Sequence, residues 1–386
     1  MLKTSKKLLL PAAYTLYMSI GITLVMMQLF SGSFMESFGL SMTELGTLLS
    51  CQFIAGIILP IFLGRISDII GKKKVLIISI AMYSLGCFIA GFSKSLIVCE
   101  IGIFLMGGGN ASANGVFSAA ISDAYPENAS RYISFTAMCV SGFNMIVSLV
   151  SSIMGSSFPD WRTMFLFAGC FILIPLILTL LARIERKDTD LKAAEGIGEL
   201  IKALRNPALI LICLATVLVS AMCMVYPSYA EGFFKDVMDA PGIARVIVFV
   251  HSFLSFASNT VFGIIKLREE TKLRICALGG GIFLILEILQ SNAIAAVAFG
   301  VLFSFVQAAA FPMCISIAAK TDPANSGTAT SLALVSNNLG SALGSYVTGA
   351  VADLWDLREG YLFIAVCGIL SGLTVFIMER YKRKKT

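Results

Sequence analysis

Charged residues are scarce in this sequence. Of 386 residues only 13% are charged, against about 25% in an ordinary soluble domain, while 57% are hydrophobic. A soluble chain of this length needs far more charge to cover its surface. The composition therefore excludes a soluble enzyme, a nucleic-acid-binding protein and a disordered chain. The net charge of +6 does not make nucleic acid a partner, because its distribution matters more than its size.

Histidine is almost absent as well. A single His, no His-Glu-x-x-His pattern and no paired acids within the apolar runs leave an intramembrane enzyme without a nucleophile–base cluster or metal ligands. The ten Cys all lie within apolar runs, where Cys behaves mainly as a small apolar residue. We therefore expect no enzymatic activity, no metal site, no cofactor and no disulfide framework.

Long apolar runs dominate what is present. Each is long enough to cross, or nearly cross, a hydrocarbon core of about 30 Å, and backbone polar groups in lipid must be bonded within the segment. Of the 29 basic and 23 acidic residues, only Glu100 and Glu287 fall inside these runs. The pattern predicts an all-α polytopic membrane protein with twelve transmembrane helices. The expected spans are 8–30, 45–63, 75–92, 96–120, 132–156, 163–182, 208–230, 246–265, 275–291, 294–319, 326–350 and 361–378.

The positions of Lys and Arg predict the orientation. With the N-terminus inside, the cytoplasmic segments hold 24 of these residues and the outer segments hold five. We therefore expect both termini in the cytoplasm. We also expect a multi-pass protein of the cell membrane, that is, the inner or cytoplasmic membrane. The first run is too long for a signal-peptide core and eleven others follow it, so it is kept as the first span.

The sequence divides into two similar halves. The basic stretch 183–207 separates six spans from six, and segment 160–167 before the sixth span resembles segment 356–363 before the twelfth. Six-helix repeats that start on the same side of the membrane are parallel, which predicts a shared cavity between them. The expected domains are 1–182, a six-helix bundle, 183–207, a cytoplasmic linker, and 208–386, a second six-helix bundle.

A glycine-rich and basic motif follows the second span. It reads Gly64-Arg65-Ile-Ser-Asp68-Ile-Ile-Gly71-Lys72-Lys73-Lys74. In this position, with twelve spans and a basic central linker, it resembles the signature loop of the major facilitator superfamily. Glycines permit close approach and a tight turn, and an acid suits a helix N-terminus. The resemblance implies that Asp68 meets the start of the eleventh span, around 326–330, and holds the cytoplasmic side shut. The implied gating residues are Gly64, Arg65, Asp68, Gly71 and Lys72.

Two further family patterns are missing. The Arg expected in the fourth span falls at Ile103, and the fifth span lacks the Gly-Pro pattern associated with drug/proton antiporters. Segment 107–114 is more similar to the fucose-type sugar/proton symporter branch, although Asn110 stands where that branch has an acid. These features favour uptake over drug export.

The polar residues within the spans are mostly amides and hydroxyls. We expect no buried Lys or Arg, and without a buried cation an anionic substrate would be costly to desolvate. Amides donate and accept hydrogen bonds, which suits neutral, hydroxyl-rich solutes. The alternative is that they join helices together. The candidate substrate-binding residues are Tyr17, Gln28, Asn110, Asn114, Asn144, Tyr226, Asn259, Gln307 and Asn337.

Three titratable residues within the spans could carry a proton. Glu100 shares one helix face with Asn110 and Asn114, although it lies near the outer boundary and could reach water. His251 is the sole histidine and either relays protons or bonds a neighbouring helix as a neutral ring. Glu287 is expected to be structural or interfacial. The candidate proton-coupling residues are therefore Glu100 and His251.

These observations together predict a secondary active transporter. It is expected to move a small neutral polar solute, sugar-like in chemistry, by alternating access and proton symport, as a monomer in the lipid bilayer. The alternative is a proton-driven multidrug or metabolite efflux antiporter, which the 28 Phe keep open.

Overall fold

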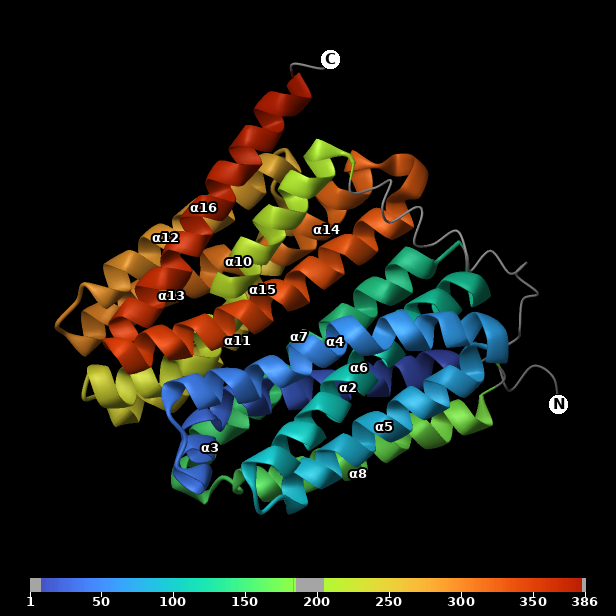
Figure 1. Ribbon diagram of the computed structural model, residues 1–386, viewed down its shortest axis with the longest axis horizontal. Coiled ribbons are helices and arrows are strands. Elements are labelled where there is room, and N and C mark those ends of the chain that lie inside the picture. Colours follow the sequence, from blue (N-terminus) through green and yellow to red (C-terminus); the bar gives the residue numbers. More distant parts are fainter. Residues whose placement is uncertain (1–7, 126, 183, 185–204, 384–386) are drawn as a thin grey trace. The chain divides into compact units, whose positions relative to one another are not determined.

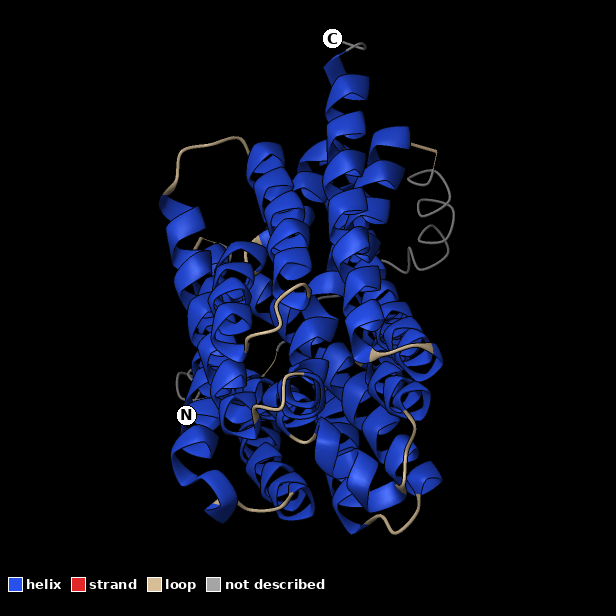
Figure 2. Cartoon of the chain, turned by 90° about the vertical axis from the view of Figure 1, so that its left-hand side faces the viewer, coloured by secondary structure: helices blue, strands red, loops and turns tan. Residues whose placement is uncertain are grey.

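The computed structural model describes residues 8–125, 127–182, 184 and 205–383, apart from the side chains of Arg65, Ser130, Arg245, Ala324 and Asp68. Within these residues every regular element is helical (Figure 2). The backbone in lipid must bond to itself, and a helix does so without a neighbouring strand. The predicted all-α class is therefore confirmed.

The chain forms two compact units. The first comprises Met1–Phe30 and Cys51–Ala193, and the second comprises Ser31–Ser50 and Ala194–Thr386. The short segment Ser31–Ser50 thus belongs by its contacts to the unit that holds the second half of the sequence. It contains the helix α3 (Ser31–Phe38) and the first turns of α4 (Met42–Ile70).

The first unit is built from long helices that lie side by side. Helix α5 packs on both α6 and α8, and α2 packs on α7 and α8 (Figure 1). Besides most of α4, its helices are α2 (Leu9–Leu29), α5 (Lys72–Phe92), α6 (Leu96–Ala124), α7 (Ala129–Met154), the 3-10 turn η1 (Gly155–Ser157) and α8 (Trp161–Leu181).

The second unit centres on α10, which packs on α15 and α16, while α12 packs on α13 and α16 (Figure 1). Its elements are α10 (Pro207–Gly232), the π-helical turn η2 (Phe233–Val237), α11 (Pro241–Ile264), α12 (Glu269–Ile288), α13 (Ala293–Gln307), α14 (Ala310–Thr321), the 3-10 turn η3 (Pro323–Asn325), α15 (Ser326–Leu354) and α16 (Leu357–Arg383).

Glycines bring α5 and α6 close together. A Cβ at Gly102 would lie 2.5 Å from the backbone nitrogen of Ala90, and one at Gly109 would lie 2.6 Å from the Ser79 carbonyl oxygen and the Tyr83 nitrogen. In lipid the hydrophobic effect does not hold helices together, so close backbone packing at small residues does. These glycines therefore fix the spacing of the helix pair.

Ten helical segments of the described residues are long and apolar enough to cross a membrane. Helices also occupy the other two predicted spans, but α12 carries Glu269, Glu270, Lys272, Arg274 and Glu287 within 20 residues. Helix α15 is rich in Ser, Gly and Asn. These two helices are therefore not among the ten that are long and apolar enough to cross a membrane.

Two boundaries differ from the prediction. Helix α4 continues to Ile70, so residues 64–70 of the expected loop are helical. The single run predicted at 294–319 is divided between α13, which ends at Gln307, and α14, which begins at Ala310. The sequence stays apolar across the boundary between α13 and α14, so hydropathy does not reveal where one helix ends and the next begins.

Candidate functional site

A polar cluster of the first unit joins α2 to α6. The Tyr17 hydroxyl donates to Asn114 Oδ1 at 2.6 Å, and the Ser118 hydroxyl lies 3.1 Å from it. Tyr17 is 5% exposed, whereas Asn114 is exposed. Because α6 turns once in 3.6 residues, Asn114 and Ser118 lie one above the other on one face. The cluster offers neutral donors and acceptors at a surface of the unit.

The other predicted residues of the first unit are half-buried. Asn110 lies one turn before Asn114, and Gln28 and Asn144 come from α2 and α7. Glu100 is also half-buried but lies 14 residues before Asn114, which is roughly 20 Å along a helix. The shared helix face therefore does not bring Glu100 to the Tyr17–Asn114 pair.

In the second unit a buried aromatic cluster surrounds Tyr226. Its hydroxyl donates to Glu287 Oε1 at 2.9 Å, and the Tyr361 hydroxyl donates to the Tyr226 carbonyl oxygen at 3.0 Å. The Phe303 ring centroid lies 4.4 Å from that of Tyr226, and the His251 ring lies 5.5 Å away. Tyr226, a predicted substrate-binding residue, is 0% exposed, and its hydroxyl and ring contact these neighbours.

His251 is 7% exposed, and its Nδ1 lies 2.9 Å from the Ser304 hydroxyl. Glu287 is 0% exposed. Glu287, expected to be structural or interfacial, is thus fully buried, and Glu100, placed first among the proton carriers, is only half-buried. The structure therefore brings His251 and Glu287 into one cluster around Tyr226.

The remaining predicted residues of the second unit lie apart from that cluster's centre. The Ser220 hydroxyl donates to Asn337 Oδ1 at 2.8 Å and joins α10 to α15. Gln307 is buried, and the Cys223 thiol lies 3.7 Å from its carbonyl oxygen. Asn259 is exposed and donates to the Ser255 carbonyl oxygen of its own helix at 2.9 Å.

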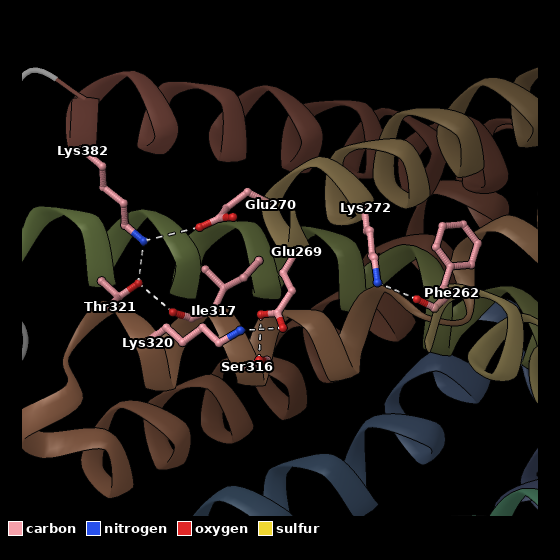
Figure 3. Close-up of polar contacts among 9 residues, drawn as sticks. All are labelled: Phe262, Glu269, Glu270, Lys272, Ser316, Ile317, Lys320, Thr321 and Lys382. Atoms are coloured by element: carbon pink, nitrogen blue, oxygen red, sulfur yellow. Dashed lines mark hydrogen bonds and ion pairs between the residues drawn. The ribbon is translucent and has the colours of Figure 1, made fainter. Parts of the chain in front are cut away.

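A charged network occupies the end of the second unit where α12 begins (Figure 3). Glu269 accepts hydrogen bonds from Lys320 at 2.6 Å and from Ser316 at 2.7 Å. Burial by itself raises the pKa of Glu269, but these hydrogen bonds hold it below its ordinary value. Lys382 donates to the Thr321 hydroxyl at 2.9 Å. The network fastens the ends of α12, α14 and α16 to one another.

One cation in this network corrects the sequence analysis, which expected no buried Lys or Arg. Lys272 is 8% exposed, and its ammonium donates to the Phe262 carbonyl oxygen at 2.6 Å (Figure 3). It lines a pocket of about 250 Å³ with Asn259, Glu269 and others. A lysine near a helix end can bury its stem while its ammonium meets a free carbonyl. Lys272 can therefore be buried because it lies outside the apolar runs, near the end of a helix.

The predicted gating residues are only partly described. The side chains of Arg65 and Asp68 lie outside the described part of the chain. Gly71 has a φ of 93°, which glycine adopts readily, and it makes the turn between α4 and α5. Around Gly64 no described atom lies within 4 Å of where a Cβ would stand. Lys72 pairs with Asp123 at the end of α6.

Residues 9–285 and 240–386 match the Major Facilitator Superfamily. The chain belongs to this family. A member of the superfamily is a transporter of small molecules, not an enzyme, and the ten apolar helices agree with a multi-pass membrane protein. The resemblance predicted from residues 64–74 is confirmed.

Solved structures of this superfamily share the fold. A D-xylose-proton symporter aligns with a TM-score of 0.82 and 16% identity, covering 96% of this chain and 97% of that chain. The nucleoside transporter NupG aligns with a TM-score of 0.78 and 16% identity, covering 98% and 100%. A bacterial homologue of the human lysosomal transporter Spinster, in an inward-facing and unoccupied conformation, aligns with a TM-score of 0.76 and 16% identity over 98% of both chains.

One curated relative matches over a short stretch. The uridine/deoxyuridine transporter of Lactococcus lactis subsp. cremoris (strain MG1363) is 40% identical over 55 residues. The match covers 14% of this chain and 12% of that protein.

Sequence reasoning missed the partners rather than the polar residues themselves. Ser118, Ser304 and Tyr361 complete the two clusters of this superfamily member, but none was singled out. Ser118 stands four residues after Asn114, a spacing that predicts a shared helix face. Ser304 and Tyr361 gave no such signal, because their partners lie on other helices.

Proposed function

We propose that this protein is a proton-coupled symporter that moves a small neutral polar solute, a sugar or a nucleoside, by alternating access. It would act as a monomer in the cell membrane, with twelve spans and both termini in the cytoplasm. The halves 1–182 and 208–386 would form parallel six-helix bundles joined by the linker 183–207.

The observation that carries the proposal is the Tyr17–Asn114–Ser118 cluster. It offers hydroxyl and amide groups at 2.6 Å and 3.1 Å from one another, on two packed helices of the first unit. A neutral hydroxyl-rich solute can exchange hydrogen bonds with such groups without leaving an unpaired charge in an apolar surrounding. Asn110, one turn away on α6, extends the same kind of surface.

The comparisons support this chemistry. Xylose, uridine and deoxyuridine are neutral molecules with several hydroxyl groups, and proteins described as transporters of such solutes share the fold or a segment of sequence with this chain. Low identity means that they support a solute class and not a particular solute.

Uptake into proteoliposomes tests the proposal. Radiolabelled uridine, deoxyuridine and D-xylose are compared with the lipophilic cation tetraphenylphosphonium, with and without an inward proton gradient. We expect at least one of the neutral solutes to accumulate only with the gradient. Extrusion of tetraphenylphosphonium without uptake of any neutral solute would contradict the symport proposal and support the efflux antiporter.

A further inference from the structure

A carboxyl group in the interior of the second unit is hydrogen-bonded on only one of its two oxygens within the described residues. Glu287 of α12 is 0% exposed, and its Oε1 accepts one hydrogen bond from Tyr226 at 2.9 Å. Its Oε2 is buried and has no hydrogen-bond partner among the residues that the structure describes. A carboxylate has about four sites for hydrogen bonds, so a single donor leaves it far from satisfied.

No charged side chain of opposite sign in the described part of the chain faces this carboxyl. None of the ion pairs in the described part of the chain includes Glu287. From α10 and α16 it meets the phenols of Tyr226 and Tyr361, and the ring of His251 on α11 lies behind Tyr226. The nearby Arg358 guanidinium donates instead to backbone carbonyl oxygens at residues 288 and 290.

The other charged residues of α12 are concentrated at its opposite end. Glu269, Glu270, Lys272 and Arg274 lie in its first six residues, with partners on neighbouring helices. From α13 the residue that faces Glu287 is Gly300, which has no side chain to titrate.

The fold leaves room for the pair of Glu287 and Tyr226. A Cβ at Gly300 would lie 2.9 Å from Glu287 Oε1 and 2.9 Å from the Tyr226 hydroxyl. Phe303, one turn further along α13, packs against the Tyr226 ring in a tilted arrangement. Four helices thus enclose one carboxyl group and its donor, with a glycine where a larger residue would displace them.

The ionisation state follows from this arrangement. A buried ionised carboxylate without a counter-charge costs far more free energy than the same group with a proton bound. This arrangement therefore favours the protonated form of Glu287, and because the group is fully buried, a proton bound there is closed off from solvent.

We propose that Glu287 is the site that binds and releases the transported proton, with Tyr226 holding the carboxyl in place. This inference rests on the proposed proton symport and deepens it. The carboxylate takes a proton when the second unit exposes it on one side of the membrane and loses that proton on the other. No other reactant is needed. Glu287, rather than Glu100, then couples solute movement to the proton gradient.

Infrared spectroscopy of the protein in lipid tests the proton site without any solute. We expect the wild-type protein at neutral pH to have a protonated-carboxyl C=O band that is absent in Glu287→Gln. The band should shift in frequency in Tyr226→Phe, which removes the hydrogen bond to Oε1, and persist in the matched control Glu100→Gln. A spectrum that Glu287→Gln leaves unchanged would overturn the proposal.

Uptake tests the coupling. With whichever of uridine, deoxyuridine or D-xylose the wild-type protein accumulates, Glu287→Gln should lose gradient-driven accumulation and retain exchange of that solute, which also shows that the variant is folded. Accumulation at the wild-type level in Glu287→Gln, or its loss in Glu100→Gln alone, would refute the assignment. If the wild-type protein accumulates none of these solutes, proton symport of this solute class fails, while the infrared result still decides whether Glu287 binds a proton.

Discussion

The Tyr17 hydroxyl donates to Asn114 Oδ1 at 2.6 Å, and this hydrogen bond joins two helices through residues that are 97 positions apart in the sequence. The hydrogen bond occupies the amide oxygen of Asn114. Its NH2 group remains the donor that an exposed asparagine presents to a solute. The tyrosine therefore bonds the amide through its oxygen, and the donors of the amide are the groups that we expect a solute to use.

Removing this amide should weaken solute binding. In Asn114→Ala the solute loses its hydrogen bonds to the side chain, and a hydrogen-bonding group left unpaired costs about 1–3 kcal/mol, which is roughly 5- to 150-fold in Kd. Asn110→Ala should act in the same direction. Calorimetric titration with the solute identified by uptake measures the effect. Ser122→Ala, on the same helix but bonded to a carbonyl of its own helix, serves as the control. Affinities within two-fold of wild type would assign both amides to helix packing.

Asp353 should make stability depend on pH. It accepts hydrogen bonds from the backbone N–H groups of Met42 and Thr43 at 2.9 Å and 2.8 Å, at the start of α4. Burial by itself raises the pKa of Asp353, but these hydrogen bonds and one with the Thr43 side chain hold it below its ordinary 3.8. A lowered pKa stabilises the folded protein fully above the ordinary value, and this contribution is lost as the pH falls through the lowered one.

We therefore expect Asp353→Asn to cost about 0.3–1 kcal/mol near neutral pH, since an exposed anion at a helix N-terminus contributes this much. Thermal unfolding of wild type and variant between acidic and neutral pH measures the difference, which should vanish at the acidic end. A difference that grows as the pH falls would contradict the assignment.

Two glycines of α6 should respond in opposite ways to the same substitution. In Gly109→Ala the new Cβ would meet backbone atoms of α5 at 2.6 Å, which cannot rotate away, and overpacking costs about 1–3 kcal/mol. In Gly115→Ala no described atom lies within 4 Å of the new Cβ. Replacing a helical glycine by alanine stabilises the folded protein by about 1 kcal/mol. Thermal unfolding in detergent distinguishes them. Equal shifts in Tm for the two variants would mean that the α5–α6 contact does not limit stability.

Neutralising Asp68 should loosen the cytoplasmic gate that the family motif implies. An acid at a helix N-terminus contributes about 0.3–1 kcal/mol, so Asp68→Asn should shift the gating equilibrium roughly two- to five-fold and lower transport without changing expression. Initial rates in proteoliposomes at matched protein content measure this, with Glu127→Gln as an exposed acidic control. Unchanged rates in Asp68→Asn would remove this residue from the gate.

The amino-acid sequence by itself determined the helical class, the membrane location of most helices and the superfamily. Lipid imposes a constraint that acts along the chain, because each span must be apolar and must satisfy its own backbone hydrogen bonds. The motif at residues 64–74 is likewise local, since Gly71 makes its turn through its own φ of 93°. Such features need no knowledge of neighbouring helices.

Only the tertiary structure distinguished Glu100 from Glu287. In the sequence both are single acids within apolar runs, and periodicity predicts which residues share a helix face but not which helix that face meets. The structure leaves Glu100 half-buried and encloses Glu287 between Tyr226, 61 positions away, and Gly300. The charge state of a buried acid depends on what surrounds it, and those surroundings come from helices distant in the sequence.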